Sequence, residues 1–333
     1  MRLRLLVLAA FACLVTALPA SAETLTKASL RLKWLPQNQF AGYYVALAKG
    51  YYRDAGIDLT INPGGPNLLT ENLIATGADT FGVSGGTESV MAAREKALPI
   101  VAVGIGHQVT PFVFITRKDG PVKTVQDFEG KKVTAWFTGA NLVLKAMLTS
   151  KGIDLGKVSL TPQQVSFTPF VNGDVDVATA TLYSDVAAVE KRLGPDSLRI
   201  FNPEDYGISI PRDTVIVSET TAKTDPKLVE NFLRASIRGW QYARLHPDDA
   251  VDIVLKVAPT LDRATERASL DVILKLMAAG SASKHGLLWI DMSRVKGTAE
   301  FLLKYGALTK PVDVEAAFKP EFLEAIPEKD RMP

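Results

Sequence analysis

The feature that most constrains this fold is a repeated alternation of short β-rich runs with segments of helical periodicity. Residues 79–86, DTFGVSGG, form one such run, and the helical pattern TESVMAAREKA follows at once. Alternation of this kind indicates α/β layers with largely parallel strands. We predict strands over residues 29–34, 58–65, 79–86, 99–106, 111–118, 131–136, 158–165, 174–181 and 213–220. We predict helices over 41–56, 68–78, 87–97, 124–130, 141–152 and 183–194, and a nearly all-helical chain from residue 225 on.

The first 22 residues have the pattern of a secretory signal peptide. Arg2 and Arg4 precede the short apolar run 5–18, and the small-x-small motif ASA follows it. The run is too short for a membrane span. We therefore predict cleavage after residue 22 and export to the periplasm. Cys13, the only cysteine, lies in the apolar run, so the mature chain would contain no thiol.

Segments 111–118 and 213–220 interrupt the alternation. Both are apolar and β-branched, and they flank the second β/α cycle, which suggests two strands on which the chain leaves one lobe and returns to it. About 310 residues remain after cleavage, more than the roughly 250–300 residues of a single core, so two lobes are expected. The predicted organisation is a signal peptide (1–22), a first lobe (23–115 and 214–333, with the C-terminal helices) and a second lobe (116–213).

The charge balance argues against a nucleic-acid partner. The chain has 38 basic and 36 acidic side chains, and loss of Arg2 and Arg4 brings the two counts to 36 each. A nucleic-acid-binding protein would need a basic surface. Three isolated histidines without a thiol give no metal-ligand spacing, and the sequence contains no Walker loop or dinucleotide fingerprint. We therefore expect no metal and no cofactor.

Three turns at predicted strand ends contain the first candidate binding residues. The turn at 82–86 matches the G-x-S-x-G nucleophile elbow between a strand and a helix. A serine hydrolase would also need an acid and a histidine downstream, and this elbow would follow too few strands. We favour a glycine-rich turn in which Ser84, Gly85 and Thr87 face a ligand, because glycine lets a ligand approach the backbone.

A second turn repeats this arrangement. Trp136 and Phe137 end a predicted strand, Thr138 and Gly139 form the turn, and a helix begins near Asn141. Unpaired amides at a helix N-terminus attract polar or anionic groups. A lone aromatic here would more often belong to the core, but open α/β sheets bind ligands at the C-terminal ends of their strands. We therefore predict that this loop faces a ligand.

The segment KWLPQNQF is the third turn. Trp34 offers the flat face of an indole, and the amides of Gln37, Asn38 and Gln39 can match donors and acceptors on the edge of a ring. The alternative is a surface loop with Trp34 tucked beneath it.

Two further segments add tyrosines and acids. TLYSDVAAVEK contains Tyr183 and Asp185, and EDYGISIPRD contains Tyr206 and Asp213. A tyrosine with a carboxylate at a strand end suits an amino-substituted heterocycle, since the carboxylate can accept from the exocyclic amine. The alternative for Asp185 is an ordinary helix N-cap.

Four segments carry a resemblance to a known family: RLKWLPQNQFAGYYVALAKGYYRDAGIDLTI, FGVSGGTESVMAAREKALPIVAVG, VQDFEGKKVTAWF and PKLVENFLRASIRGWQYARLHPDDAV. They resemble the thiamine-pyrimidine-precursor branch of ABC-transporter substrate-binding proteins, also described as the sulfonate-binding/thiamine-pyrimidine-synthase-like family. The resemblance covers nearly the whole mature chain. It implies a type II periplasmic binding fold, in which two α/β lobes joined by two crossover strands close on a small-molecule ligand. The partner would be an ABC permease in the inner membrane, and we expect a monomer.

The resemblance also implies roles for particular residues. Trp34 would stack on the ligand ring, and the loops 84–87 and 136–139 would face the cleft. Tyr183 and Asp185 lie where the family places ligand-contacting side chains of the second lobe. A pyrimidine synthase of the same fold carries an active-site lysine and histidine where this chain has GVSGGTES, and a cysteine-rich metal motif where it has YGISIPRD. Neither stretch contains Lys, His or Cys, so we expect binding without catalysis.

The ligand stays open among three classes. We rank a thiamine pyrimidine precursor (hydroxymethyl- or formylaminopyrimidine) first, riboflavin second, and a sulfonate such as taurine third. Compact anions need an arginine or several amides that converge on one charge, whereas KWLPQNQF offers an indole and side-chain amides. We expect the lobes to close over the stacked ring, with hinges near Thr116 and Thr214, and the closed surface to signal occupancy to the permease.

Overall fold

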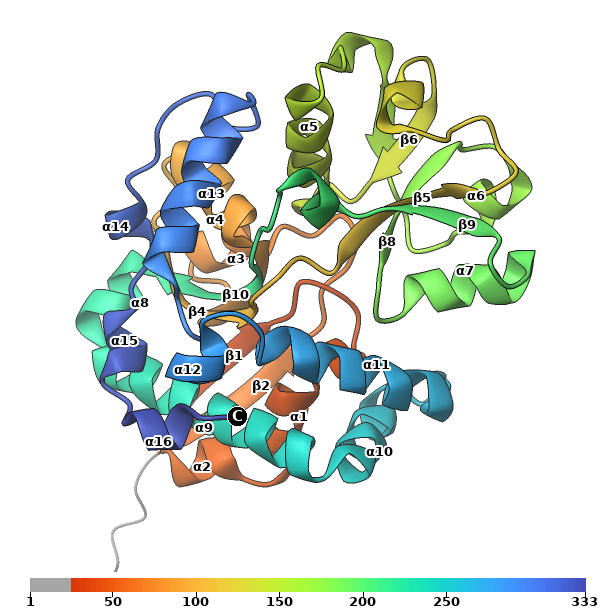
Figure 1. The fold of residues 1–333 in the computed structure, drawn as a ribbon. Helices are drawn as coiled ribbons and strands as arrows, with labels where there is room; N and C mark the ends of the chain where they lie inside the picture. Colours follow the sequence, from red (N-terminus) through yellow and green to blue (C-terminus); the bar gives the residue numbers. More distant parts are fainter. Residues whose placement is uncertain (1–24) are drawn as a thin grey trace, which may run out of the picture.

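The structure is a computed structural model that describes residues 25–333 of the chain (Figure 1). The predicted signal peptide, residues 1–22, lies outside the described residues. Figure 1 shows two lobes, and each is built on its own five-stranded β-sheet. Within the described part of the chain, no helix combines the length and the apolar character that crossing a membrane would require.

The first sheet has the strand order β2-β1-β3-β10-β4. Strand β1 runs parallel to β2 and β3, whereas β10 is antiparallel to β3 and β4. The strands are β1 (Thr26–Arg31), β2 (Ile57–Asn62), β3 (Phe81–Gly86), β4 (Ile100–His107) and β10 (Arg212–Ser218). Strands β3 and β4 are buried along their whole length, as expected of a sheet covered by helices on both faces.

The second sheet has the order β7-β6-β8-β5-β9. Strand β6 runs parallel to β7 and β8, and β5 is antiparallel to β8 and β9. The strands are β5 (Phe112–Arg117), β6 (Lys132–Ala135), β7 (Ser159–Pro162), β8 (Val177–Thr181) and β9 (Leu198–Phe201). Strand β9 is not among the predicted strands, because its residues LRIF are too few to give a periodic signal.

The two segments that interrupt the β/α alternation are β5 and β10, the antiparallel strands of the two sheets. Each lies wholly within one sheet, so the chain passes between the lobes at residues 108–111 and 207–211. Thr116 is paired with Val177 and Arg199, and Thr214 with Ser84 and Ile105. Both residues are therefore held by neighbouring strands on both sides, and the hinges predicted near Thr116 and Thr214 stay a prediction. The predicted domain boundaries after residues 115 and 213 also fall inside these strands.

Helices cover both faces of each sheet (Figure 1). Those of the first lobe are α1 (Ala41–Ala48), α2 (Tyr51–Asp54), α3 (Thr70–Ala75), α4 (Thr87–Glu95), α8 (Glu219–Thr224), α9 (Pro226–Leu245), α10 (Pro247–Val257), α11 (Arg263–Met277), α12 (Ala282–His285), α13 (Met292–Lys304), α14 (Val314–Ala317), α15 (Glu321–Glu324) and α16 (Glu328–Arg331). Those of the second lobe are α5 (Ala140–Ser150), α6 (Thr168–Asn172) and α7 (Asp185–Leu193). Short 3₁₀ turns are η1 (Asn38–Phe40), η2 (Val125–Phe128), η3 (Leu155–Lys157) and η4 (Pro203–Tyr206). The predicted helix 41–56 is divided into α1 and α2, because Gly50 adopts a left-handed φ of 77° between them.

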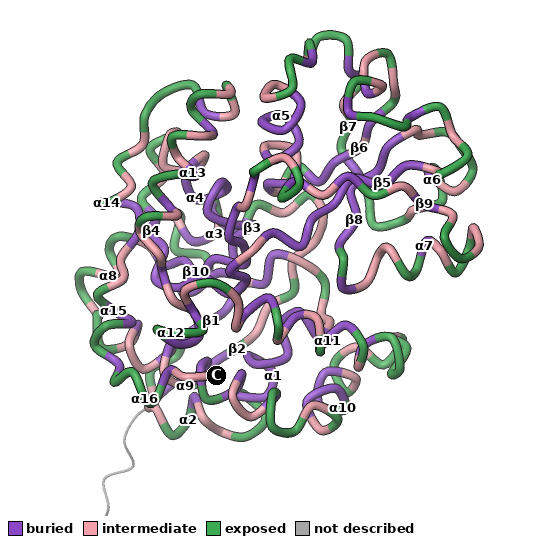
Figure 2. The backbone as a smooth tube through the Cα atoms, in the orientation of Figure 1, coloured by how far each residue is buried: buried purple, intermediate pink, exposed green. Residues whose placement is uncertain are grey.

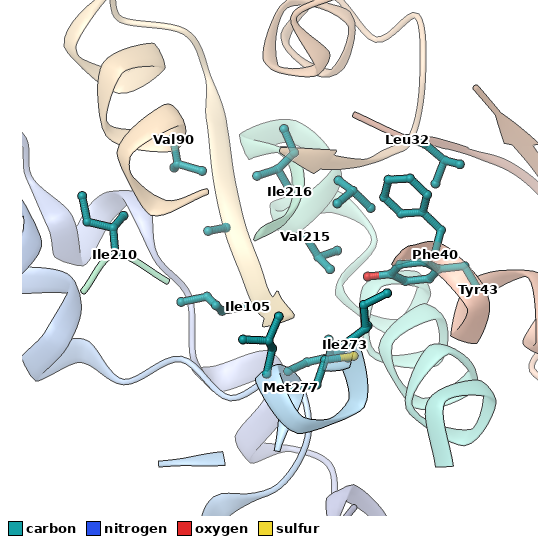
Figure 3. Packing of buried hydrophobic residues seen from close by; sticks show 14 of the residues in the cluster. Leu32, Phe40, Tyr43, Val90, Ile105, Ile210, Val215, Ile216, Ile273 and Met277 are labelled. Carbon is teal, nitrogen blue, oxygen red and sulfur yellow. The ribbon is translucent and has the colours of Figure 1, made fainter. Parts of the chain in front are cut away.

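The core of the first lobe lies between its sheet and the covering helices. Figure 2 shows the central strands buried and the outward sides of the helices exposed. Phe232 of α9 stacks on Phe81 of β3 with ring centroids 3.8 Å apart. Figure 3 shows another part of this core, which includes Phe40, Tyr43 and Val215 of β10. Burial of these apolar side chains is the main force that holds helices and sheet together.

Helices α1 and α9 approach each other closely because each has a glycine at the contact. A Cβ on Gly239 would lie 2.0 Å from the carbonyl oxygen of Gly42, and a Cβ on Gly42 would lie 2.2 Å from the Trp240 ring. The α1 backbone therefore fills the space that a side chain on Gly239 would need, and the Trp240 ring fills the space that a side chain on Gly42 would need.

We predict that Gly239→Ala lowers the free energy of unfolding by about 1–3 kcal/mol, because the added methyl overpacks this contact. Urea unfolding followed by circular dichroism measures the change. The matched control is Gly297→Ala on α13, where an added Cβ meets nothing within 4 Å; it should raise stability by about 0.5–1 kcal/mol. Equal stabilities for the two variants would contradict the packing argument.

Candidate functional site

A cavity of about 260 Å³ lies between the two lobes. Its wall includes three residues that each follow a parallel strand: Trp34 after β1, Trp136 after β6 and Tyr183 after β8. The starts of β5 and α11 add Phe112 and Thr265 to the wall, and the start of β10 places Arg212 at the floor of the cavity. Because the C-terminal ends of parallel strands share one edge of a sheet, the two lobes present these edges to each other.

The structure brings several of the predicted binding residues together on this wall. They are Trp34, Gln39, Trp136, Thr138, Tyr183 and Asp185. Their convergence from distant parts of the chain agrees with a cleft between the lobes, and their contact with a ligand stays a prediction.

Two indoles form the most distinctive part of the wall. The rings of Trp34 and Trp136 have centroids 5.5 Å apart and planes at 65°, an edge-to-face arrangement. Trp34 is half-buried, whereas Trp136 is buried and its indole N–H has no hydrogen-bond partner within residues 25–333. A planar guest in the cavity can therefore stack on an indole of this wall.

A buried ion pair lies at the floor of the cavity. The guanidinium of Arg212, at the start of β10, pairs with the carboxylate of Glu88 in the first turn of α4, and neither residue is exposed to solvent. The same guanidinium lies 3.7 Å from the ring centroid of Phe112, the first residue of β5. The pair thus joins two elements of the first lobe and packs against the second.

A second charged group lies beside the first. The ammonium of Lys33 pairs with Asp213 and donates to the carbonyl oxygen of Gly85 at 3.3 Å, and the Gln39 amide donates to the other oxygen of Asp213 at 2.7 Å. Burial lowers the pKa of Lys33, and Asp213 opposes that shift. Burial alone would raise the pKa of Asp213, but the charges of His107 and Lys33 and the hydrogen bonds from Lys33 and Gln39 together hold it below its usual value.

The carboxylate of Asp185 is used by its own loop. It accepts from the backbone N–H of Thr181 at 2.9 Å and from the Thr181 hydroxyl at 2.6 Å. Burial raises the pKa of Asp185, and the bonds from Thr181 and Ser184 act in the opposite direction. Ser184, not Asp185, occupies the cap position of α7. Asp185 therefore fixes the conformation of the loop that contributes Tyr183 to the cavity wall.

Asn38 is buried in the first lobe and is not on the cavity wall. Its backbone and side-chain N–H groups donate to Glu266 of α11 at 2.9 and 3.0 Å. Burial raises the pKa of Glu266, and these two bonds oppose the shift. The sequence predicts a ligand contact at Asn38, but in the structure its amide anchors the loop that carries Trp34.

Ser84 and Thr87 are also fully buried and absent from the wall. The Ser84 hydroxyl donates to Glu71, and the Thr87 hydroxyl donates to the Pro211 carbonyl at 3.1 Å. Among the hydrogen bonds of residues 25–333, none joins Ser84 to a histidine. The turn therefore has neither the exposure nor the partner that a serine nucleophile needs.

The glycines of the two loops permit contact between the lobes. A Cβ on Gly85 would lie 2.0 Å from the carbonyl oxygen of Thr138, and a Cβ on Gly139 would lie 2.3 Å from Oε1 of Glu88. Gly139 also has a φ of 127°, which side chains disfavour. In this structure the Thr138 carbonyl of the second lobe occupies the space beside Gly85, and the Glu88 side chain of the first lobe occupies the space beside Gly139. Contact of the 82–86 turn with a ligand stays a prediction.

Phe137 and Tyr206 lie away from the cavity. Phe137 is 44% exposed and lines a separate hollow of about 140 Å³ that Leu69 and Ser89 also line. Tyr206, in η4, has the ammonium of Lys151 5.3 Å from its ring centroid. Neither position supports the predicted ligand contact.

Four further residues line the cavity without being predicted from the sequence: Lys33, Phe112, Arg212 and Thr265. The adjacent opposite charges of Arg212 and Asp213 between two apolar runs are a signal that could have been used. No local pattern marks Thr265, because it reaches the cavity only through the packing of α11.

A family model described as NMT1/THI5 like matches residues 37–250. The chain belongs to the NMT1/THI5-like family. It is 30% identical over 313 residues to the riboflavin-binding protein RibY of Chloroflexus aurantiacus, covering 92% of this chain and 88% of RibY. It is 27% identical to a formylaminopyrimidine-binding protein of Halalkalibacterium halodurans, covering 89% of this chain and 90% of that protein. It is 25% identical to the 4-amino-5-hydroxymethyl-2-methylpyrimidine phosphate synthase of Legionella pneumophila, covering 71% and 75%.

The NMT1/THI5-like chain also shares its fold with solved periplasmic binding proteins. The periplasmic aliphatic sulphonate binding protein SsuA of Escherichia coli superposes with a TM-score of 0.63 at 15% identity, over 88% of this chain and 92% of SsuA. The predicted periplasmic binding fold with two α/β lobes is confirmed.

Because His107 is buried, the stability of this protein is expected to depend on pH. The His107 side chain is 1% exposed, and burial lowers its pKa to about 4; Lys33 and Arg212 act in the same direction, and Asp213 opposes them. The unfolded chain has the ordinary histidine pKa of about 6.5, so the folded state binds fewer protons between these values. The contribution of the neutral His107 side chain to the free energy of unfolding is complete above pH 6.5 and is lost as the pH falls toward 4.

We predict that the His107 imidazole alone lowers the free energy of unfolding by about 3 kcal/mol between pH 7 and pH 4. Urea unfolding of the wild type and of His107→Asn over this range measures it, and the variant should have the shallower pH dependence. His246→Asn, at an exposed position, is the control and should retain the wild-type slope. A His107 variant with the wild-type slope would contradict the prediction.

Proposed function

We propose that this protein is the periplasmic solute-binding component of an ABC importer, and that it binds a neutral flat heterocycle by closure of its two lobes. A thiamine pyrimidine precursor, hydroxymethyl- or formylaminopyrimidine, is the first candidate ligand. The relatives named for riboflavin and formylaminopyrimidine binding support a receptor for planar heterocycles. The partners would be an inner-membrane permease and the small molecule, with the receptor acting as a monomer.

The proposal rests on a difference in chemistry between the wall of the cavity, which is aromatic, and its floor, where the charges are paired. The wall presents two indoles, Trp34 and Trp136, at 5.5 Å. Among residues 25–333, the two cations that line the cavity are Lys33 and Arg212, and each is paired with a buried carboxylate. A sulfonate would need positive charge that no carboxylate offsets, whereas a neutral ring gains from stacking. Sulfonate therefore stays the third choice.

Size supports the smaller heterocycle. The cavity of about 260 Å³ is below the roughly 300–1,000 Å³ of sites that hold drug-sized ligands. A single pyrimidine ring fits such a volume with little rearrangement, and a tricyclic flavin with its ribityl chain would need wider separation of the lobes. Riboflavin remains the second candidate because the relative at 30% identity is named for riboflavin binding.

An enzymatic role is the weaker proposal despite the relative named as a synthase. In this chain the stretches GVSGGTES and YGISIPRD contain no lysine, histidine or cysteine, so they lack the groups that the synthase chemistry would use at those places. The buried hydroxyl of Ser84 gives no support to a hydrolase.

Titration calorimetry on the mature protein tests the proposal, with hydroxymethylpyrimidine, formylaminopyrimidine, riboflavin and taurine as separate ligands. Mass spectrometry of any molecule that co-purifies from the periplasm provides an independent identification. Binding of taurine in preference to all three heterocycles would overturn the proposal.

We predict that Trp34→Ala weakens binding of the preferred heterocycle at least tenfold, about 1.4 kcal/mol, because both the stacking and the buried ring area are lost. Trp34→Phe keeps an aromatic face and should lose less. Circular dichroism should show that both variants retain the fold, since Trp34 is only half-buried. Unchanged affinity of Trp34→Ala would remove Trp34 from the binding site.

A further inference from the structure

The two lobes are joined by direct hydrogen bonds on two sides of the cavity. In each case a serine hydroxyl on a first-lobe helix donates to a main-chain carbonyl in a second-lobe loop. The donors are Ser89 of α4 and Ser269 of α11, and the acceptors are the carbonyls of Thr138 and Tyr183. Both acceptor residues line the cavity.

On the α4 side the contact depends on two glycines. The Ser89 hydroxyl lies 3.1 Å from the Thr138 carbonyl oxygen. Any Cβ on Gly85 would meet that carbonyl at 2.0 Å, and any Cβ on Gly139 would meet the Ser89 hydroxyl at 2.6 Å. The lobes can therefore reach this separation only while both positions lack a side chain.

On the α11 side the contact is shorter and more deeply buried. Ser269, 3% exposed, donates to the Tyr183 carbonyl at 2.6 Å. Glu266, one turn earlier on the same helix, accepts two bonds from Asn38 in the loop that follows Trp34. Helix α11 thus holds a cavity loop of its own lobe and a cavity loop of the other lobe.

We propose that Ser89 and Ser269 are positioning residues that latch the second-lobe loops onto the first lobe and so hold the closed state around the ligand. The inference rests on the proposed binding function and adds to it the groups that couple occupancy to closure. The bonds connect side chains of one lobe to the backbone of the other, so they exist only when the lobes are together. Their loss should therefore speed ligand release and leave the association rate unchanged.

We call the two serine-to-carbonyl hydrogen bonds between the lobes the latch. Its effect on lobe closure can be measured without knowing which ligand the protein binds. The mature chain would have no cysteine, because Cys13 lies in the predicted signal peptide. Spin labels on Asp174→Cys and Lys256→Cys, exposed positions in different lobes, report the interlobe distance by pulsed electron paramagnetic resonance. Distances are recorded without ligand, with hydroxymethylpyrimidine and with riboflavin, and stopped-flow tryptophan fluorescence gives the two rate constants.

We predict that Ser269→Ala and Ser89→Ala each raise the dissociation rate of the ligand about two- to tenfold, the effect of one hydrogen bond. Each should also reduce the short-distance population, which is the fraction of molecules whose two spin labels are at the shorter interlobe distance of the closed state. The effects should multiply in the double variant because the two bonds lie at separate contacts. Ser150→Ala is the matched control, since its hydroxyl donates to the Met147 carbonyl within α5 at 2.7 Å; it should behave as the wild type.

A second variant tests closure from the opposite direction. Gly85→Ala on the Ser89→Ala background removes the serine hydroxyl that would otherwise meet the new methyl inside the first lobe. The remaining obstacle is the Thr138 carbonyl of the second lobe. This variant should lose the short-distance population while its thermal unfolding stays close to that of Ser89→Ala.

The outcomes separate the two proposals. A wild type that binds none of the offered ligands contradicts the ligand assignment, while its ligand-free distances still test the latch. Serine variants with wild-type distances and dissociation rates overturn the latch, as does a wild type with no short-distance population under any condition.

Discussion

The arrangement of this protein depends on two buried ion pairs at the start of β10. Arg212 and Asp213 are adjacent, have opposite charges, and pair with Glu88 on α4 and Lys33 after β1. Loss of one partner from a buried pair costs about 3–5 kcal/mol, because the other charge is left uncompensated. Asp213 also has a left-handed φ of 57°, a strain of about 1–3 kcal/mol that the surrounding contacts must offset. The pairs therefore fix β10, α4 and the loop after β1 in one relative position.

These two ion pairs form the floor of the cavity and limit the interactions by which it can recognise a ligand. Both cations are balanced by carboxylates, so the discriminating groups are those of the wall: the indoles of Trp34 and Trp136 and the donors around them. Arg212 also packs against Phe112 at 3.7 Å, so the floor of one lobe is in contact with the first strand of the other. The two ion pairs and the packing of Arg212 on Phe112 therefore lie where the two lobes are in contact. The hydrogen bonds that Ser89 and Ser269 make to the second lobe lie around this region.

The sequence predicts the architecture well where the signal is long or periodic. The β/α alternation predicts most strands, and the two apolar segments outside the alternation are β5 and β10, the strands at which the chain changes lobe. The short strand β9 and the break at Gly50 between α1 and α2 lack such a signal. A β-branched run predicts where a strand lies but not where its hydrogen-bonded ladder ends. Thr116 and Thr214 are paired within their sheets.

The sequence by itself determined the fold class and three of the loops that form the cavity wall, because loops at the C-terminal ends of parallel strands must meet at one edge of each sheet. Only the tertiary structure decided which side chains of these loops reach the cavity. Trp34 and Trp136 do, while Ser84, Thr87 and Asn38 turn inward to Glu71, Pro211 and Glu266. The physical reason is that a polar side chain near an interface bonds to whichever partner the packing brings within reach. Those partners are 13, 124 and 228 residues away in the chain, beyond any local pattern.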